Sequence, residues 1–109
     1  MENKKVRITF KVQPEFNLDE TIYNEIYLVG NVNELGNWNP ENALTLVKKN
    51  NVYRKTKTFF AGEKIEFKFL LNKTFDKVEL DENFVEIANR EFVCNESQTI
   101  NLTVKNFKL

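Results

Sequence analysis

The chain has 109 residues, with 16 basic and 16 acidic side chains and a formal net charge of +0. This length suits a single domain, residues 1–109, that buries a core without disulfides. The neutral balance argues against nucleic acid as a ligand, because such binding depends largely on clustered Lys and Arg. No apolar run approaches membrane-spanning length, so we expect no membrane partner.

Apolar and polar residues alternate with a period of two along most of the chain, which is typical of half-buried β-strands. Eight segments separated by turn residues follow this pattern: 6–12, 25–30, 42–47, 52–60, 64–71, 77–80, 89–94 and 99–107. No segment has the pattern of an amphipathic helix, and residues 31–36 form one helical turn at most. Seven or eight short strands predict an all-β fold, an antiparallel two-sheet sandwich.

The residues that enzymes use for catalysis are scarce. The chain has no histidine, so Cys94, the single cysteine, has no base to make it a nucleophile, and we expect a small buried hydrophobe. An acidic cluster, Glu79, Asp81 and Glu82, lacks the defined environment of a glycosidase acid/base pair, so we expect a solvated loop. There is no metal-ligand spacing and no phosphate loop, so we expect no cofactor, no metal and no enzyme.

Three segments, in order along the chain, resemble the signature of family 20 carbohydrate-binding modules, the starch-binding domains. IYLVGNVNELGNWNPENALTL has a strand ending in V-G, a turn with L-G-N-W, and A-L-x-L. AGEKIEFKFLL resembles the family's A-G-x-x-x-E-[YF]-K-[YF] strand, and NREF resembles N-R-x-[YF]. The resemblance covers about residues 6–104. It implies a non-catalytic, immunoglobulin-like β-sandwich that binds α-1,4-linked glucans.

The implied partners are an α-glucan (starch, glycogen, a maltooligosaccharide or cyclodextrin) and a catalytic domain in the same or an associated chain. We expect a monomer. The first residues, MENKKVRITF, lack the apolar stretch of a signal peptide. We therefore expect a cytoplasmic location, unless the sequence is a domain excised from a secreted enzyme.

Trp38, the only tryptophan, is the implied sugar-stacking platform. The apolar face of a glucose ring needs a flat, exposed aromatic, and the turn residues around Trp38 keep it at the surface. The alternative is a core residue that covers the end of the sandwich. Lys68 lies on the strand face opposite Phe67 and should point out of the core. The family's matching lysine contacts sugar hydroxyls, although an ordinary solvated lysine is the alternative.

The second platform of this site is a tryptophan in the family, and here the chain departs from the pattern. Counting back from Asn89 places Phe84 at this position, whereas counting forward from Lys68 places Leu80 there. We favour Phe84, because an aromatic ring can stack. Asn89 matches a family asparagine that hydrogen-bonds sugar, and a turn residue that starts a strand is the alternative.

The family's second binding site has only partial counterparts. Tyr53 falls at one of its positions, and Tyr23 lies one residue from another. The missing second tryptophan also leaves another function open. In that alternative the chain is a β-sandwich protein-interaction or scaffold domain of the same family with weakened or lost sugar binding.

Overall fold

The computed structural model describes residues 4–15, 25–50 and 52–108, and strands account for most of them. The strands are β1 (Lys5–Pro14), β2 (Glu25–Gly30), β3 (Leu44–Lys49), β4 (Val52–Phe60), β5 (Lys64–Leu70), β6 (Glu79–Leu80), β7 (Arg90–Val93), β8 (Gln98–Val104) and β9 (Asn106–Phe107). Three short 3-10 helices lie between them: η1 (Asn33–Trp38), η2 (Pro40–Asn42) and η3 (Phe75–Lys77). Within the described ranges, no helix is long and apolar enough to cross a membrane.

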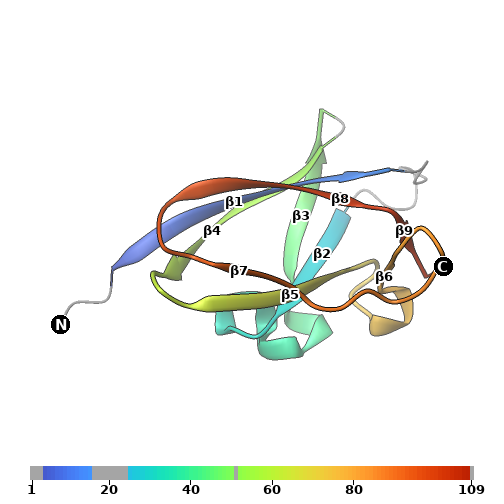
Figure 1. The fold of residues 1–109 in the computed structure, drawn as a ribbon, viewed down its shortest axis with the longest axis horizontal. Helices are drawn as coiled ribbons and strands as arrows, with labels where there is room; N and C mark the ends of the chain where they lie inside the picture. The colour runs from blue at the N-terminus through green and yellow to red at the C-terminus, as the bar shows by residue number, and fades with distance from the viewer. Residues whose placement is uncertain (1–3, 16–24, 51, 109) are drawn as a thin grey trace.

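Seven strands form one sheet in the order β7-β5-β2-β3-β4-β1-β8, and β6 pairs with β9 in a separate two-stranded sheet. β3 and β4 pair only next to their hairpin, from Val47–Arg54 to Lys49–Val52. The large sheet therefore divides there into two layers. One layer contains β7, β5, β2 and β3, and the other contains β4, β1 and β8 (Figure 1).

Phenylalanine rings from both layers fill the space between them. Phe10 on β1 meets Phe59 on β4 and, across the interior, Phe67 on β5 and Phe92 on β7, with ring centroids 5.9–6.1 Å apart. All these contacts are edge-to-face, an arrangement that aromatic pairs prefer. Strands distant in the sheet order thus share one core, which confirms the predicted all-β sandwich.

One detail of the predicted fold needs correction. The strand count roughly agrees, since the described residues form nine strands and the last predicted strand divides into β8 and β9. The sandwich is not purely antiparallel, however, because β8 pairs with β1 in parallel, from Ile8–Gln98 to Pro14–Val104. The chain crosses between layers after β7, so β8 reaches the free edge of β1 running in the same direction, as parallel pairing requires.

A second, smaller cluster lies on the outer face of β2 and β5, and we call it the outer cluster. It consists of Val29, Ala43, Leu70, Val78 and Leu80, with Tyr27 and Trp38 packed against it. Side chains alternate along a strand, so Leu28 and Phe69 face the main core while their neighbours Val29 and Leu70 face this cluster.

Candidate functional site

The turn that carries Trp38 has an unusual backbone. Gly36, Asn37 and Trp38 are three consecutive residues with positive φ, at 82°, 51° and 63°. Hydrogen bonds hold the turn, from Asn37 N to Val32 O at 3.0 Å and from Asn39 N to Gly36 O at 2.9 Å. A left-handed conformation costs a non-glycine residue about 1–2 kcal/mol. The hydrogen bonds of the turn therefore keep the backbone of Trp38 in this unfavourable conformation, which fixes the direction of the indole.

The indole ring is half-buried and packs against the outer cluster rather than the phenylalanine core. One side of the ring is thus supported by apolar contacts, and part of it remains in solvent. A residue that covered the end of the main core would contact the Phe10 and Phe67 rings instead. This placement favours the surface-platform interpretation of Trp38 over the core interpretation.

Lys68 borders the same cluster from β5. It pairs with Val29 across the β2–β5 ladder, so its side chain leaves the strand on the outer face, as predicted. The side chain is 16% exposed, and its Nζ lies 3.7 Å from Glu86 Oε1. Trp38 and Lys68 therefore both border the outer cluster, on the same face of the sandwich.

Asn89 directly precedes β7 and is exposed. The β5–β7 register pairs Phe67 with Arg90. Continued by one residue, this register brings Asn89 to the position opposite Lys68, on the outer face. Three of the four predicted sugar-binding residues, Trp38, Lys68 and Asn89, are thus arranged along the outer side of β2, β5 and β7.

Phe84 and Leu80 differ sharply in exposure. Leu80 is 8% exposed and belongs to the outer cluster, so its side chain offers no free face. Phe84 is 68% exposed and, like Trp38, has a left-handed backbone, with φ 61°. Asp81 organises its turn, because Asp81 Oδ1 accepts hydrogen bonds from Asn83 N at 2.8 Å and Val85 N at 3.0 Å. Of these two candidates for the second platform, only Phe84 exposes its side chain, an aromatic ring, to solvent.

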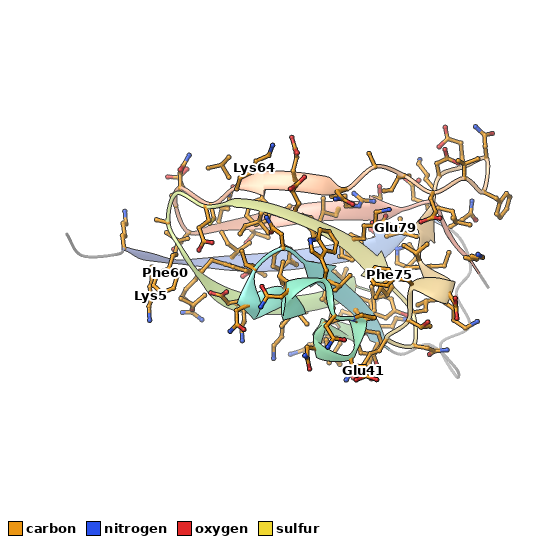
Figure 2. The ribbon with its side chains drawn as sticks, turned by 90° about the horizontal axis from the view of Figure 1, so that it is seen from below. Lys5, Glu41, Phe60, Lys64, Phe75 and Glu79 are labelled. Atoms are coloured by element: carbon orange, nitrogen blue, oxygen red, sulfur yellow. The ribbon has the colours of Figure 1, made fainter. Side chains whose placement is uncertain are left out.

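The acidic cluster corrects one prediction. Glu79, which is labelled in Figure 2, is fully buried on β6 rather than part of a solvated loop. Arg90 Nη2 donates to its Oε2 at 2.8 Å, Arg90 Nε donates to its Oε1 at 3.0 Å, and Phe69 N also donates to its Oε1 at 3.0 Å. The guanidinium also stacks on the Phe69 ring, 5.1 Å from its centroid. The pair is structural, and its partners lie too far apart in the sequence for a local pattern to reveal it.

The second predicted site is not supported at Tyr53. This side chain is 2% exposed and belongs to the main core, where burial raises the pKa of the phenol. Its ring has no free face for a sugar, because the alternation along β4 turns it inward with Phe59. Tyr23, the other candidate, lies outside the described residues.

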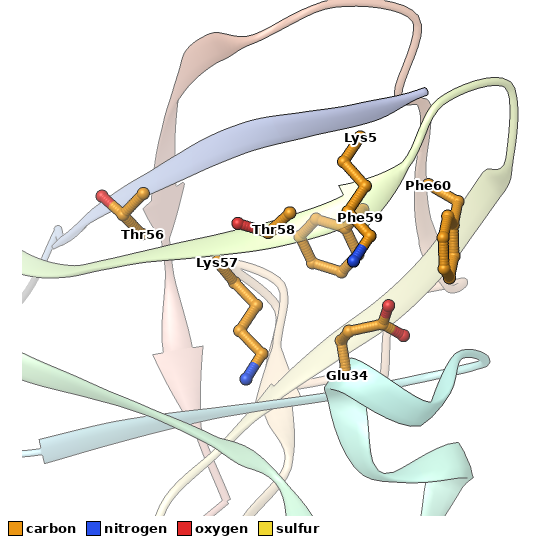
Figure 3. Close-up of a pocket in the computed structure, with 7 residues that line it drawn as sticks. All are labelled: Lys5, Glu34, Thr56, Lys57, Thr58, Phe59 and Phe60. Carbon is orange, nitrogen blue, oxygen red and sulfur yellow. The ribbon is translucent and has the colours of Figure 1, made fainter. Parts of the chain in front are cut away.

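Cys94 is buried, as predicted. Its Sγ lies 3.0 Å from Phe60 O, and burial raises the pKa of the thiol. No group of three or more potential metal ligands occurs in residues 4–15, 25–50 and 52–108. A hollow of about 370 Å³ lies between β4 and η1, lined by Glu34, Lys57 and Phe60 among others (Figure 3).

A β-sandwich that holds a half-exposed indole beside an amine and an amide has the architecture of a non-catalytic carbohydrate-binding module. The family described as "Starch binding domain" matches residues 5–104. The chain therefore belongs to the starch-binding domain family, and the resemblance found in the sequence is confirmed.

Curated relatives include the cyclomaltodextrin glucanotransferases of Bacillus sp. strain 38-2 and Bacillus sp. strain 1011. Each is 44% identical over 50 residues, and each match covers 41% of this chain and 7% of the relative. The chain thus spans only a small part of the length of these enzymes.

Solved structures share the fold. The glucoamylase from Hypocrea jecorina superposes with a TM-score of 0.70 at 16% identity, over 96% of this chain and 18% of that one. The γ-cyclodextrin glucanotransferase (gamma-CGTase) from alkalophilic Bacillus clarkii gives 0.65 at 25% identity, over 95% and 16%. The family 20 module of the maltotetraose-forming amylase from Pseudomonas saccharophila STB07 gives 0.65 at 20% identity, over 90% of this chain and 99% of that one.

Proposed function

We propose that this module binds α-1,4-linked glucans such as starch, glycogen and maltooligosaccharides on the outer face beside β5. Trp38 stacks on the apolar face of one glucose unit, and Phe84 is the second, smaller platform. The Lys68 ammonium donates to sugar hydroxyls, and the Asn89 amide both donates and accepts. The bound module holds a catalytic domain, in the same or an associated chain, near the polysaccharide.

One observation carries the proposal: the two predicted platforms are the two aromatic residues with positive φ in the described part of the chain. The others with positive φ, glycines apart, are Asn37, Asn50, Asn72 and Lys73. Asparagine tolerates this conformation, whereas bulky side chains adopt it rarely. Backbone strain that persists at exposed aromatics is typical of functional sites.

The energetics suit a weak to moderate binder. A stacked glucose hides about 50–80 Å² of apolar surface, worth roughly 1.5–2 kcal/mol at about 25 cal/mol per Å². Two platforms and a few hydrogen bonds approach micromolar affinity only if the site is pre-organised. Glu86, 3.7 Å from the Lys68 ammonium, competes with sugar hydroxyls for it. We therefore expect a dissociation constant above the micromolar range.

The test is a titration with maltoheptaose followed by tryptophan fluorescence, because Trp38 is the only tryptophan. We expect a saturable change in the wild type and a loss of retardation in amylopectin gels for Trp38→Ala. Lys77→Ala, a cation outside the proposed site, is the matched control and should bind normally. No saturable change, with wild-type mobility equal to that of Trp38→Ala, would instead favour the scaffold alternative.

A further inference from the structure

The charges of this neutral chain are unevenly distributed between the two layers. The strands β1, β4 and β8 together contain six Lys and Arg residues and no Asp or Glu. Three of the six cations, Arg7, Lys11 and Arg54, share the outer face of this layer, because they alternate with the inward-facing Ile8, Phe10 and Tyr53. This outer face is therefore basic, although the chain carries no net charge.

Lys11 and Arg54 are directly opposite each other in the β1–β4 ladder. Like charges in this position destabilise a sheet. Among the residues that the structure describes, neither side chain forms an ion pair. The sheet therefore carries a local repulsion that a bound anion would relieve.

Hydroxyl groups surround these cations. Thr9 and Thr56 are paired across the ladder with their Oγ1 atoms 2.8 Å apart, and Thr99 on β8 pairs with Thr9. A shallow hollow of about 500 Å³ is lined by these three threonines together with Lys11, Arg54 and Lys55. Guanidinium, ammonium and hydroxyl groups are all donors to an oxyanion, so the hollow has the chemistry to hold a carboxylate or a phosphate.

We propose that this surface, which we call the basic face (Arg7, Thr9, Lys11, Arg54, Thr56 and Thr99), docks an acidic surface of a partner protein. Carboxylates seated between Lys11 and Arg54 supply the missing counter-charge. The basic face belongs to the layer opposite the one that carries Trp38. A module bound to glucan through one layer therefore leaves the other layer available for the protein that it brings to the polymer.

Two features favour a protein over a nucleic acid. Single-stranded nucleic acids bind to aromatic platforms as well as to cations, and no aromatic side chain is among the described residues that line the hollow around Thr9 and Thr56. The hollows are shallow and lie side by side, since a second one of about 460 Å³ adjoins the first at Thr9, Thr56 and Thr99. A broad, flat surface of this kind suits another folded surface.

Lys57 is excluded from the basic face by its direction. In Figure 3 its side chain points from β4 toward η1, whereas Thr56 and Thr58 point to the other side of the strand. It lines the hollow that also contains Glu34, so an acidic group lies near it. The proposal therefore depends on Arg7, Lys11 and Arg54, with Lys55 at the border of the hollow.

The test uses octaglutamate as the acidic probe, in NMR titrations of the isotope-labelled chain at about 20 mM and 150 mM salt. We expect amide shifts on β1, β4 and β8, and weaker binding at higher salt. Lys11→Glu should lower the affinity at least tenfold while raising the urea midpoint, because the new carboxylate pairs with Arg54. Lys64→Glu changes the charge equally on the other layer and should keep the wild-type affinity.

Several results would overturn the proposal. They are absence of octaglutamate binding at low salt, an equal loss in Lys64→Glu, or shifts that map outside the three strands. A lower urea midpoint for Lys11→Glu would refute the cross-strand repulsion. The last measurement is the affinity for a thymidine oligonucleotide of the same charge. Tighter binding of this oligonucleotide than of octaglutamate would show that the partner is a nucleic acid rather than a protein. Maltoheptaose binding is measured on the same variants, so failure of the glucan site is seen separately.

Discussion

The buried pair between Glu79 and Arg90 allows a quantitative test of the packing described here. Glu79→Ala removes a carboxylate that accepts from Arg90 Nη2 at 2.8 Å, Arg90 Nε at 3.0 Å and Phe69 N at 3.0 Å. The substitution leaves the guanidinium and the Phe69 N–H without their acceptor. Removal of one partner of a buried ion pair costs about 3–5 kcal/mol. Because the Arg90 side chain is 23% exposed, water can partly replace the carboxylate, and we expect about 3 kcal/mol.

A second ion pair on the same strand is the control. Glu91, next to Arg90, pairs with Lys64 at 3.2 Å, but both side chains are more than half exposed. Exposed pairs contribute about 0–1 kcal/mol, so Glu91→Ala should change the free energy of unfolding by less than about 1 kcal/mol. The two variants remove the same charge from ion pairs that involve adjacent residues of β7, Arg90 and Glu91, and the two pairs differ in burial.

Urea unfolding followed by far-UV circular dichroism measures both effects. For an m-value of about 1–1.5 kcal/mol/M, the midpoint should fall by roughly 2–3 M in Glu79→Ala and by less than about 1 M in Glu91→Ala. If Glu79→Ala does not fold, Glu79→Gln, which keeps an acceptor for Phe69 N–H, supplies the intermediate value. Equal midpoints for the Glu79 and Glu91 variants would refute the argument from burial.

Three further predictions concern the turns and the thiol. Asp81→Ala removes the acceptor that shapes the Phe84 turn, so calorimetry with maltoheptaose should show an affinity loss of about two- to tenfold at an unchanged urea midpoint. Gly36→Ala, at φ 82°, places a methyl group 2.7 Å from a backbone oxygen and should lower the thermal midpoint strongly. Gly62→Ala, at φ 92° but in open space, should cost only about 1 kcal/mol and lower the midpoint far less. Equal shifts in the two variants would contradict the steric argument. Burial raises the pKa of the Cys94 thiol, which lowers its thiolate fraction at pH 8, so native protein should react with a disulfide reagent much more slowly than urea-unfolded protein.

Strand positions and side-chain directions were predictable because both follow from a period of two. Lys68 illustrates this point. Its place between Phe67 and Phe69 is sufficient to turn it out of the main core, and the β2–β5 ladder confirms that direction. The Trp38 turn was equally visible, because Gly36 and the asparagines beside it favour a tight turn.

Features that depend on pairing between distant segments were not predictable in this way. Alternation in residues 98–104 specifies a strand but not its neighbour, so the parallel partner β1 was missed. Glu79 lies in an acidic segment that resembles a solvated loop, and its burial is explained by two distant donors, Arg90 and the Phe69 N–H. Counting residues left Phe84 and Leu80 as alternatives, because a loop of unusual length shifts one count against the other. Burial in three dimensions favours the exposed Phe84 over the buried Leu80.

The departures from local consistency in this fold are concentrated at its surface. Natural sequences mostly agree with their fold at every level, and exceptions tend to mark function. Here the core rings pack edge-to-face without conflict, whereas Trp38 and Phe84 have a left-handed backbone and Lys11 faces Arg54. Each exception lowers the stability of the free module. Under the two proposals, a docked anion would relieve the repulsion between Lys11 and Arg54, whereas the backbone strain at Trp38 and Phe84 is the cost of holding two aromatic rings at the surface.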